Sequence, residues 1–477
     1  MSEYNFKGGY YDGAFHEEKP ALILTDISPW NKAVLCQWYA TAVTPAVQSA
    51  KEAFPKWRDC SLSERIHFLK KYQNLLIQNQ AIGIELISRE AGKIQSDAQS
   101  EWQSMIKKID WTINISLKRI ESINIENGEC VFLPRGVAVV LGPFNFPGHL
   151  PNGQIIPALL SGNTVIFKPS EYAPLVGQLI TQLFHEAGLP KGVFNLVQGG
   201  SDMGVMLVQN PEVSLVLFTG SYEVGKLIAE HCMHNPNKLA ALEMGGMNVA
   251  VIHEDADLKQ AVHECIDGAF KIAGQRCTAT RKILLHKKVW QKGLTLFQEQ
   301  IAGLKLGKSW DDQDAFCGPL VNKKALLQYQ QYRQDMAHLK TECITPNFLA
   351  ESNASGFFAV PVMHFFQDGH SFPVLKNEIF FPALQMESFE NLSQVQSVIH
   401  QTGYGLSASI FCKERLLFQE FRKSIQVGCV NWNRSTAGAS SELPFGGLGR
   451  SGNARPAGIM MIDACVYPVA SLWNKLK

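Results

Sequence analysis

The feature that most constrains the fold is a series of short, mainly apolar segments that alternate with helix-length ones. Val137–Leu141, Thr164–Phe167 and Ser214–Phe218 are such segments, and each leads into a loop with glycine or proline. They are typical of parallel strands buried on both faces, and such strands are joined by crossover helices. The pattern therefore predicts an α/β fold with a doubly wound, Rossmann-type parallel sheet. In such a fold, ligands lie at the carboxyl ends of the strands.

The chain on either side of this series has a different character. Glycines and prolines in residues 1–40 predict short strands, and apolar residues at three- and four-residue steps predict helices from 44 to about 115. Ser61 and Glu64 predict a capping box. Residues 120–132 alternate loosely and predict a strand that leaves the main body. A second strand–helix series begins near Val249, and the C-terminal tail has moderate β character.

Composition excludes several classes of protein. A length of 477 residues predicts two or three domains, and a net charge of +1 without charged blocks argues against nucleic acid or an anionic membrane as partner. The N-terminus lacks the apolar core of a signal peptide, and no apolar run reaches the roughly 18 residues of a membrane span. Eleven cysteines, without a Cys-x-x-Cys pair, argue against a disulfide framework and a metal site. We expect a cytoplasmic protein with reduced thiols.

A candidate nucleophile lies in the segment Ala269-Phe-Lys-Ile-Ala-Gly-Gln-Arg-Cys-Thr-Ala-Thr-Arg281. Cys277 follows a Gly-Gln-Arg turn, and Arg276 and Arg281 could lower the pKa of its thiol. Gly274 would allow close approach of the backbone to a reacting group, and the Cys277 N–H could face an oxyanion. On its own, a buried structural cysteine is the commoner explanation.

Two further candidates are polar residues in loops after strands. Glu243 ends an apolar segment beside two glycines and could act as a general base with a raised pKa. Asn145 lies in a proline-bounded loop, and its side-chain N–H could stabilise an oxyanion. A capping glutamate and an Asx turn are the structural alternatives.

Glycines and charges also mark a candidate nucleotide-binding rim. Gly220-Ser-Tyr-Glu-Val-Gly225 lies where a strand becomes a helix, which suits a phosphate, although a glycine-capped turn explains it equally well. Lys168 and Glu171 follow another parallel strand on the same rim. A carboxylate there suits ribose hydroxyls and favours NAD over NADP. A solvated helix start is the alternative explanation for both residues.

Taken together, these motifs resemble those of the aldehyde dehydrogenase superfamily over essentially the whole chain. The resemblance rests on the motifs in their order: Gly142-Pro-Phe-Asn-Phe-Pro147, Lys168-Pro-Ser-Glu171, Phe218-Thr-Gly-Ser221, Leu242-Glu-Met-Gly-Gly246, Gly274-Gln-Arg-Cys277 and Pro444-Phe-Gly-Gly447. Four stretches are closer to one branch, the N-succinylglutamate 5-semialdehyde dehydrogenases of arginine catabolism: Asn145-Phe-Pro-Gly-His-Leu-Pro-Asn-Gly153, Ala273-Gly-Gln-Arg-Cys-Thr278, Val430-Asn-Trp-Asn433 and Gly452-Asn-Ala-Arg-Pro456.

The resemblance implies an NAD-dependent oxidation of an aldehyde. Cys277 would be the nucleophile, Glu243 the base and Asn145 an oxyanion donor. The cofactor would be bound by a set of residues from several loops: Gly220, Ser221, Tyr222, Glu223, Val224, Gly225, Lys168, Glu171, Glu378 and Phe380. Phe381 departs from the family, which usually has glycine there, so the resemblance fixes the chemistry but not the exact pose of the nicotinamide ribose. His149, Arg276 and Arg455 are candidates for binding the substrate carboxylates.

The resemblance also implies three structural units. These are an NAD-binding domain (1–115 and 134–245), a catalytic domain (246–445) and a small β arm (116–133 and 456–477) that pairs subunits into a homodimer or a higher homo-oligomer. Two alternatives stay open. Another semialdehyde dehydrogenase of the superfamily would share these residues, and a non-catalytic protein could retain the fold.

Overall fold

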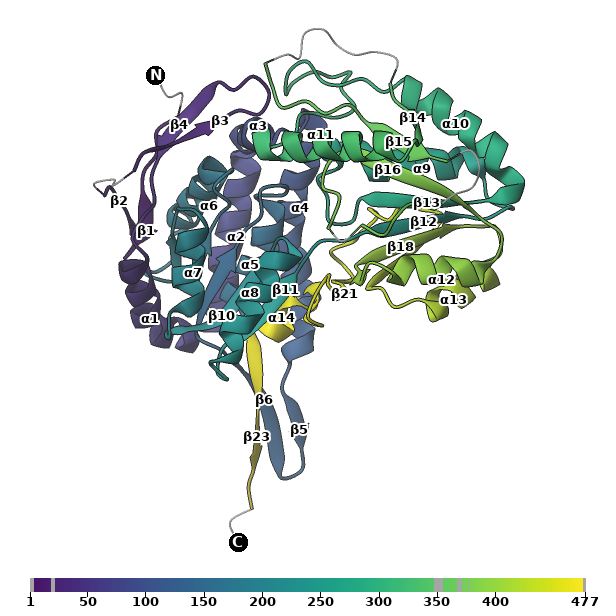
Figure 1. Cartoon of the computed structure of the whole chain (residues 1–477). Coiled ribbons are helices and arrows are strands. Elements are labelled where there is room, and N and C mark those ends of the chain that lie inside the picture. Colours follow the sequence, from purple (N-terminus) through teal and green to yellow (C-terminus); the bar gives the residue numbers. More distant parts are fainter. Residues whose placement is uncertain (1–3, 19–21, 347–354, 367–370, 376, 475–477) are drawn as a thin grey trace.

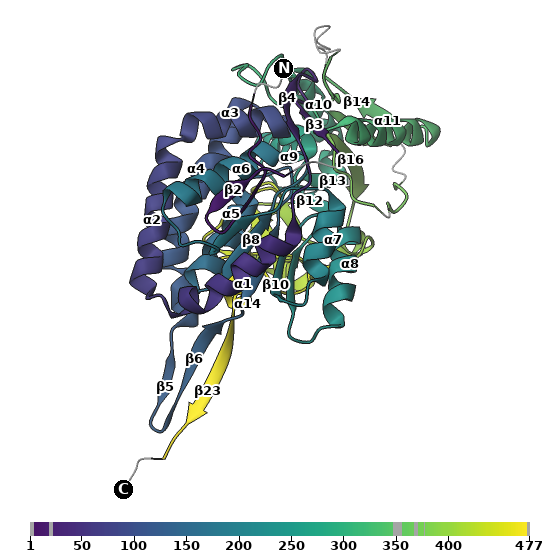
Figure 2. The ribbon, with the colours of Figure 1, turned by 90° about the vertical axis from the view of Figure 1, so that its left-hand side faces the viewer.

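The computed structural model describes residues 4–18, 22–346, 355–366, 371–375 and 377–474. Two large sheets form separate lobes side by side, and a narrow three-stranded arm projects away from them (Figure 1). The second view shows the arm standing clear of the helices (Figure 2). No helix in the described ranges is both long enough and apolar enough to cross a membrane.

The first large sheet has the strand order β11-β10-β7-β8-β9-β1-β2. Its strands are β1 (Gly9–Tyr11), β2 (Ala14–His16), β7 (Val137–Leu141), β8 (Thr164–Lys168), β9 (Phe194–Leu196), β10 (Val213–Thr219) and β11 (Leu239–Glu243). The strands from β11 to β9 run parallel, as the apolar segments predicted, whereas β1 pairs antiparallel with β9 and β2. Because the central strands run the same way, Lys168, Thr219 and Glu243 end at one edge of the sheet.

Helices cover both faces of this sheet because its side chains alternate between two cores. One core joins Ala138 and Val140 to α5 and α6 and the helices behind them, and the other joins Val137 and Val139 to α1, α7 and α8. The helices of this lobe are α1 (Val43–Asp59), α2 (Leu62–Gln78), α3 (Gln80–Ala91), α4 (Gln95–Asn114), α5 (His149–Leu160), α6 (Pro174–Glu186), α7 (Ser201–Gln209) and α8 (Tyr222–Met233). The predicted capping box of Ser61 and Glu64 begins α2.

The second large sheet has the order β14-β15-β16-β13-β12-β18-β19 and is parallel apart from β14. Its strands are β12 (Asn248–Ile252), β13 (Thr280–His286), β14 (Glu342–Ile344), β15 (Val362–Phe365), β16 (Ala383–Phe389), β18 (Ser407–Phe411) and β19 (Cys429–Trp432). The helices around it are α9 (Leu258–Phe270), α10 (Trp290–Ala302), α11 (Lys323–His338), α12 (Leu392–His400) and α13 (Arg415–Ser424). The chain crosses from β11 to β12 through residues 244–247, so the first sheet leads directly into the second.

Short elements complete the lobes. They are the paired strands β3 (Leu24–Ile27) and β4 (Val34–Trp38), β17 (Tyr404–Gly405) and β21 (Leu448–Gly449), and β20 (Pro444–Phe445) and β22 (Ala457–Gly458), with α14 (Met461–Ala464) and the 3₁₀ turns η1 (Ser116–Ile120), η2 (Lys271–Gly274) and η3 (Lys287–Val289).

The arm corrects one expectation. Residues 120–132 do not form one strand: after η1 they turn back in a hairpin of β5 (Ile123–Ile125) and β6 (Gly128–Pro134). The C-terminal strand β23 (Val466–Leu472) pairs with the whole length of β6, from Val466 opposite Pro134 to Leu472 opposite Gly128. The two ends of the predicted arm, far apart in sequence, thus form one antiparallel sheet. The boundaries of the three predicted units stay a prediction, and residues 475–477 lie outside the described part.

Candidate active site

A cavity of about 1120 Å³ lies where the two lobes meet. The ends of β10 and β11, the start of α8, the face of α4 and the turn before β13 all contribute to its wall. Most of the residues predicted for the site line this cavity: Cys277, Glu243, Asn145, Gly220, Ser221, Tyr222, Glu223, Val224, Glu171, Glu378, Phe380, His149 and Arg276. The structure therefore brings together residues from segments more than 200 positions apart.

Cys277 follows a left-handed turn of the backbone. Ile272, Ala273 and Gly274 all have positive φ, and a Cβ on Gly274 would lie 2.5 Å from the Phe381 carbonyl oxygen. Such conformations are unfavourable for side chains other than glycine, so the surroundings must hold them in place. The buried Arg281 guanidinium does so by donating to the Gly274 carbonyl and, at 2.9 Å, to the Phe381 carbonyl. The turn is thereby fixed to the segment that carries Glu378.

The environment of the Cys277 thiol contradicts one expectation. Burial, together with the nearby carboxylates of Glu378 and Glu243, raises the pKa of the Cys277 thiol to about 12. The two arginines were expected to lower this pKa. However, the Arg281 guanidinium donates its hydrogen bonds to backbone carbonyls, and the Arg276 guanidinium lies 3.7 Å from the Asp97 carboxylate. The thiol is therefore protonated in the ligand-free protein, and a base must take its proton before it attacks.

Glu243 has the properties of such a base. Its Oε1 accepts a hydrogen bond from the Ala457 N–H at 3.1 Å, whereas its Oε2 is buried and makes no hydrogen bond within the described part of the chain. Burial raises the pKa of Glu243 well above its usual value. A carboxylate with one oxygen held and the other free can accept a proton from a thiol or from a water molecule.

Asn145 is fixed by the loop that carries Cys277. Its Nδ2 donates to the Gln275 carbonyl at 2.8 Å, and the side chain is buried in the cavity wall. A carboxamide has two N–H groups, so one stays available for a ligand oxygen. This arrangement suits an oxyanion donor beside the nucleophile.

The start of α8 forms the rim expected for a phosphate. Ser221 caps the helix by accepting from the Val224 N–H at 3.4 Å, and residues 220–224 line the cavity. The first N–H groups of a helix lack partners within it and attract anions. Gly225 serves packing instead, because a Cβ there would lie 2.3 Å from Met244 Sδ.

The two residues predicted to bind the adenosine ribose are in different positions. Glu171 lines the cavity, whereas Lys168 is buried behind the rim and donates to the Pro169 carbonyl at 3.0 Å. Burial lowers the pKa of Lys168, and the carboxylates of Glu171 and Asp202 partly offset that effect. A half-buried carboxylate at 171 fits ribose hydroxyls. The free N–H groups of α8 fit a pyrophosphate, so the residues present suit a dinucleotide.

Glu378 also lines the cavity. Its Oε1 accepts from the Gly246 N–H at 2.9 Å, and a Cβ on Gly245 would lie 2.0 Å from its Oε2, so the carboxylate rests directly on the crossing segment. Burial raises the pKa of Glu378 to about 7. Phe380 faces Phe144 edge-on at 5.8 Å. Phe381 lies outside the left-handed region and packs against Tyr329 and Tyr332, so the departure from glycine strains no backbone here.

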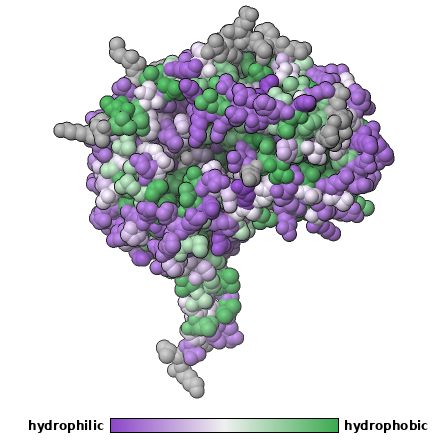
Figure 3. Space-filling model, in the orientation of Figure 1, coloured by the Kyte–Doolittle hydropathy of each residue, from purple (hydrophilic) through white to green (hydrophobic). Residues whose placement is uncertain are grey.

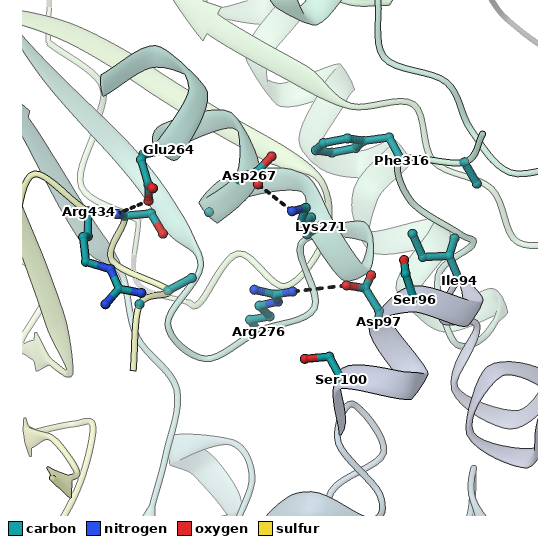
Figure 4. A pocket seen from close by; sticks show the side chains of 15 residues that line it. Ile94, Ser96, Asp97, Ser100, Glu264, Asp267, Lys271, Arg276, Phe316 and Arg434 are labelled. Carbon is teal, nitrogen blue, oxygen red and sulfur yellow. Dashed lines mark hydrogen bonds and ion pairs between the residues drawn. The ribbon is translucent and has the colours of Figure 1, made fainter. Parts of the chain in front are cut away.

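The three candidates for substrate carboxylates separate in the structure. His149 lines the large cavity, and its Nδ1 is buried without a hydrogen bond to any described residue. Arg276 stands between this cavity and a smaller one of about 460 Å³, where its guanidinium points toward Asp97 (Figure 4). Arg455 is exposed and is not among the described residues that line either cavity. It lies near Arg135, whose pKa burial lowers, with a smaller contribution from Arg455. The structure does not bring Arg455 to the site.

Sequence reasoning missed the contribution of α4. Ser100, Ser104 and Lys108 of this helix line the cavity, and Glu101 accepts hydrogen bonds from the N–H groups of Gly148 and His149 at 2.9 and 3.0 Å. Glu101 and Lys108 are seven residues apart and lie on the buried face of the helix. Their spacing on the apolar face of the helix predicts that both side chains are buried, but it does not predict what they contact.

Comparison with known proteins agrees with this geometry. The profile of the Aldehyde dehydrogenase family matches residues 16–468. The chain belongs to the aldehyde dehydrogenase family. It is 36% identical to N-succinylglutamate 5-semialdehyde dehydrogenase of Burkholderia thailandensis, covering 99% of this chain and 96% of that protein. It is also 36% identical to the protein of that name from Caulobacter sp. strain K31, covering 97% and 96%.

Solved structures of this family have the same fold. Betaine aldehyde dehydrogenase of Staphylococcus aureus, solved in complex with NAD⁺, has a TM-score of 0.92 at 25% identity, covering 98% of this chain and 94% of that one. The aldehyde dehydrogenase KauB of Pseudomonas aeruginosa has a TM-score of 0.91 at 26% identity, covering 99% and 97%. The chain is thus an NAD(P)-dependent aldehyde dehydrogenase. Among the described residues, no cluster of histidine, cysteine and acidic side chains could hold a metal ion.

Proposed function

We propose that the protein oxidises N-succinyl-L-glutamate 5-semialdehyde to N-succinyl-L-glutamate with NAD⁺. The observation that carries this proposal is the convergence of Cys277, Glu243 and Asn145 in one buried cavity of a chain that is 36% identical to enzymes of that name over its whole length. Glu171 on the rim favours NAD over NADP, because a carboxylate repels a 2′-phosphate.

Each residue has a defined step in the proposed reaction. Glu243 accepts the thiol proton, and the Cys277 sulfur attacks the aldehyde carbon to form a thiohemiacetal. The remaining Nδ2–H of Asn145 and the Cys277 N–H hold its oxyanion. NAD⁺, when bound, supplies the acceptor for the hydride that leaves this carbon. Glu243 then passes the thiol proton to solvent, and its carboxylate accepts a proton from the water molecule that attacks the thioester. The acid leaves, and the departing Cys277 thiolate takes this second proton from Glu243, which restores the thiol.

The units of the fold have separate roles in the proposal. Residues 1–115 and 134–245 would bind NAD, residues 246–445 would carry the nucleophile, and residues 116–133 with 456–477 would pair subunits. The cofactor contacts would come from the α8 start and from Glu171, Glu378 and Phe380, which line the cavity. Lys168, buried behind the rim, would act by supporting the loop rather than by touching the cofactor.

The test is the rate of NADH formation with a panel of aldehydes. N-succinylglutamate semialdehyde is compared with succinate semialdehyde, glutamate semialdehyde and hexanal at matched concentrations. The proposal expects the highest kcat/KM with the succinylated compound. A clear preference for another semialdehyde would keep the mechanism and replace the substrate. Binding of NAD⁺ without turnover of any aldehyde would favour a non-catalytic protein.

A further inference from the structure

Lys108 is a buried ammonium group in the wall of the active-site cavity. It projects from α4, and the residue is only 2% exposed. Its Nζ donates to the Gly458 carbonyl at 3.0 Å, and no ion pair joins it to an acid in the part of the chain that the structure describes. Burial lowers the pKa of Lys108 to about 8. A neutral carbonyl is thus the acceptor for a buried cation that faces the cavity.

The neighbouring buried lysine shows what is missing at Lys108. Lys93 is also fully buried, but the Glu101 carboxylate lies 2.5 Å from its Nζ and the Phe146 ring lies beneath it at 3.5 Å. Buried charges in proteins are normally paired in this way, since an unpaired ion is costly to remove from water. An ammonium that lines a ligand cavity without such a partner can pair with an anionic group of the ligand.

The surroundings of Lys108 suit a carboxylate. His149 lies in the same region, and its Nδ1 is buried without a hydrogen-bond partner among the described residues. Burial and the charges of Lys108 and Lys93 lower the pKa of His149 to about 3, so the imidazole is neutral and can donate from one nitrogen. Gly153 faces Lys108 from α5 with no side chain, which leaves space above the ammonium.

This region is connected directly to the reacting centre. The Ala457 N–H donates to Glu243 Oε1, and the carbonyl of the next residue, Gly458, accepts from Lys108. Adjacent residues of one segment thus contact the base and Lys108, and Cys277 lines the same cavity. Arg276 is less suited to pairing with an anionic group of the ligand, because Asp97 already faces its guanidinium (Figure 4).

We propose that the Lys108 ammonium, with His149 beside it, binds a carboxylate of the substrate and so selects aldehydes that carry a carboxylate a few bonds from the aldehyde carbon. This inference rests on the proposed function and deepens it, because it names the group that recognises the charge of the substrate.

The experiment compares K108Q with wild type on carboxylated and neutral aldehydes. Glutamine retains a donor for the Gly458 carbonyl but removes the charge. For N-succinylglutamate and succinate semialdehydes, KM is expected to rise about 10- to 100-fold, since a hydrogen bond to a charged group contributes roughly 1.5–3 kcal/mol. For hexanal, the loss of kcat/KM is expected to be at least tenfold smaller. The matched control is K107Q, which removes an exposed charge from the adjacent position of α4.

A second measurement separates binding from folding. Glutarate and N-succinylglutamate should raise the Tm of wild type and of K107Q but not that of K108Q, while K108Q without ligand should be at least as stable as wild type. An equal loss of kcat/KM on hexanal, or a lowered Tm of free K108Q, would assign Lys108 to holding the Gly458 turn and overturn the inference. No loss on any substrate would also overturn it. If wild type prefers another carboxylated semialdehyde and K108Q raises KM for that compound, the named substrate fails while the role of Lys108 stands.

Discussion

At the scale of single residues, the site combines a protonated thiol with two carboxyl groups. Burial and the charges of Glu378 and Glu243 act in the same direction on Cys277, and each favours the neutral thiol. The free Oε2 of Glu243 is therefore central, because it is a buried acceptor for the thiol proton. The same oxygen suits the later activation of water, so one carboxylate serves both halves of the reaction.

Removing the charge of Glu243 should make the Cys277 thiol more acidic. A negative charge near a thiol raises its pKa, so E243Q is expected to lower the pKa of Cys277 from its value near 12. The measurement is the rate of alkylation by iodoacetamide against pH in the absence of cofactor, with the labelled cysteine identified by mass spectrometry. A curve that stays in place, or that moves to higher pH, would show that Glu243 does not act on the thiol. E223Q, at an exposed position of the rim, is the control.

The same variant should separate the two halves of turnover. With the water-activating carboxylate gone, thioester hydrolysis is expected to slow by roughly 10²- to 10⁴-fold. Rapid mixing at alkaline pH, where hydroxide can take the thiol proton in place of Glu243, should then give a burst of NADH followed by a slow steady state, with acylated Cys277 detectable by mass spectrometry. C277A should give neither burst nor steady-state turnover. A steady-state rate of E243Q equal to that of wild type would contradict the assigned role.

At the scale of elements, α4 supports the loop that carries Asn145. Glu101 joins the Lys93 ammonium on one side to the N–H groups of Gly148 and His149, at the start of α5, on the other. A carboxylate at the start of a helix also interacts favourably with the helix dipole. The position of the oxyanion donor thus depends on a buried ion pair more than 40 residues earlier in the chain.

Replacing one partner of this ion pair should lower the free energy of unfolding more than replacing both partners. E101Q leaves Lys93 buried without its partner, and a loss of about 3–5 kcal/mol in the free energy of unfolding is expected. The double variant K93M/E101Q should recover much of that loss, because no unpaired charge remains. Urea unfolding of the single and double variants measures both values. Additive losses in the double variant would mean that the two side chains do not interact energetically.

The elements also show which parts of the site were readable from the sequence. Asn145 and Glu243 could be predicted because they lie at the carboxyl ends of the apolar strands β7 and β11, which parallel topology brings to one edge of the sheet. Cys277 lies between η2 and β13, and its Gly-Gln-Arg turn identified it instead. Lys108 could not be predicted, because its role depends on how α4 packs across the cavity, and helical spacing alone marks it only as buried. The predicted lowering of the Cys277 pKa by Arg276 and Arg281 was wrong, because closeness in sequence does not show which acceptors each guanidinium contacts.

At the scale of the whole molecule, the arm was predicted in position but not in detail. A two-residue turn of Glu126 and Asn127 divides the expected strand into β5 and β6, with Ile125 opposite Gly128. The pairing of β6 with β23 joins residues more than 300 positions apart, and no local pattern encodes it. The arm exposes apolar side chains, because a sheet of three strands has no core of its own in which to bury them.

This apolar surface leads to a prediction about assembly. Ile125 and Leu472 flank Gly128 on the arm, at 62% and 81% exposure, and the arm carries a band of hydrophobic residues (Figure 3). Large exposed apolar groups on a projecting sheet mark a protein–protein contact, and we expect a homodimer or a higher homo-oligomer that buries them. The double variant I125E/L472E should dissociate it, because two carboxylates in an apolar contact are costly to bury. Light scattering coupled to gel filtration measures the mass.

The control for assembly is N124E, which adds a charge at the intervening position of β5, where the side chain points to the opposite face. If the arm forms the contact through the Ile125 face, N124E should retain the wild-type mass and I125E/L472E should show a smaller one at equal concentration. Because both substituted side chains are exposed, the Tm of the dissociated protomer should fall only by the contribution of the lost contact, and its circular dichroism should keep the α/β signature. A monomeric wild type, or a double variant of unchanged mass, would assign the apolar arm to some other contact.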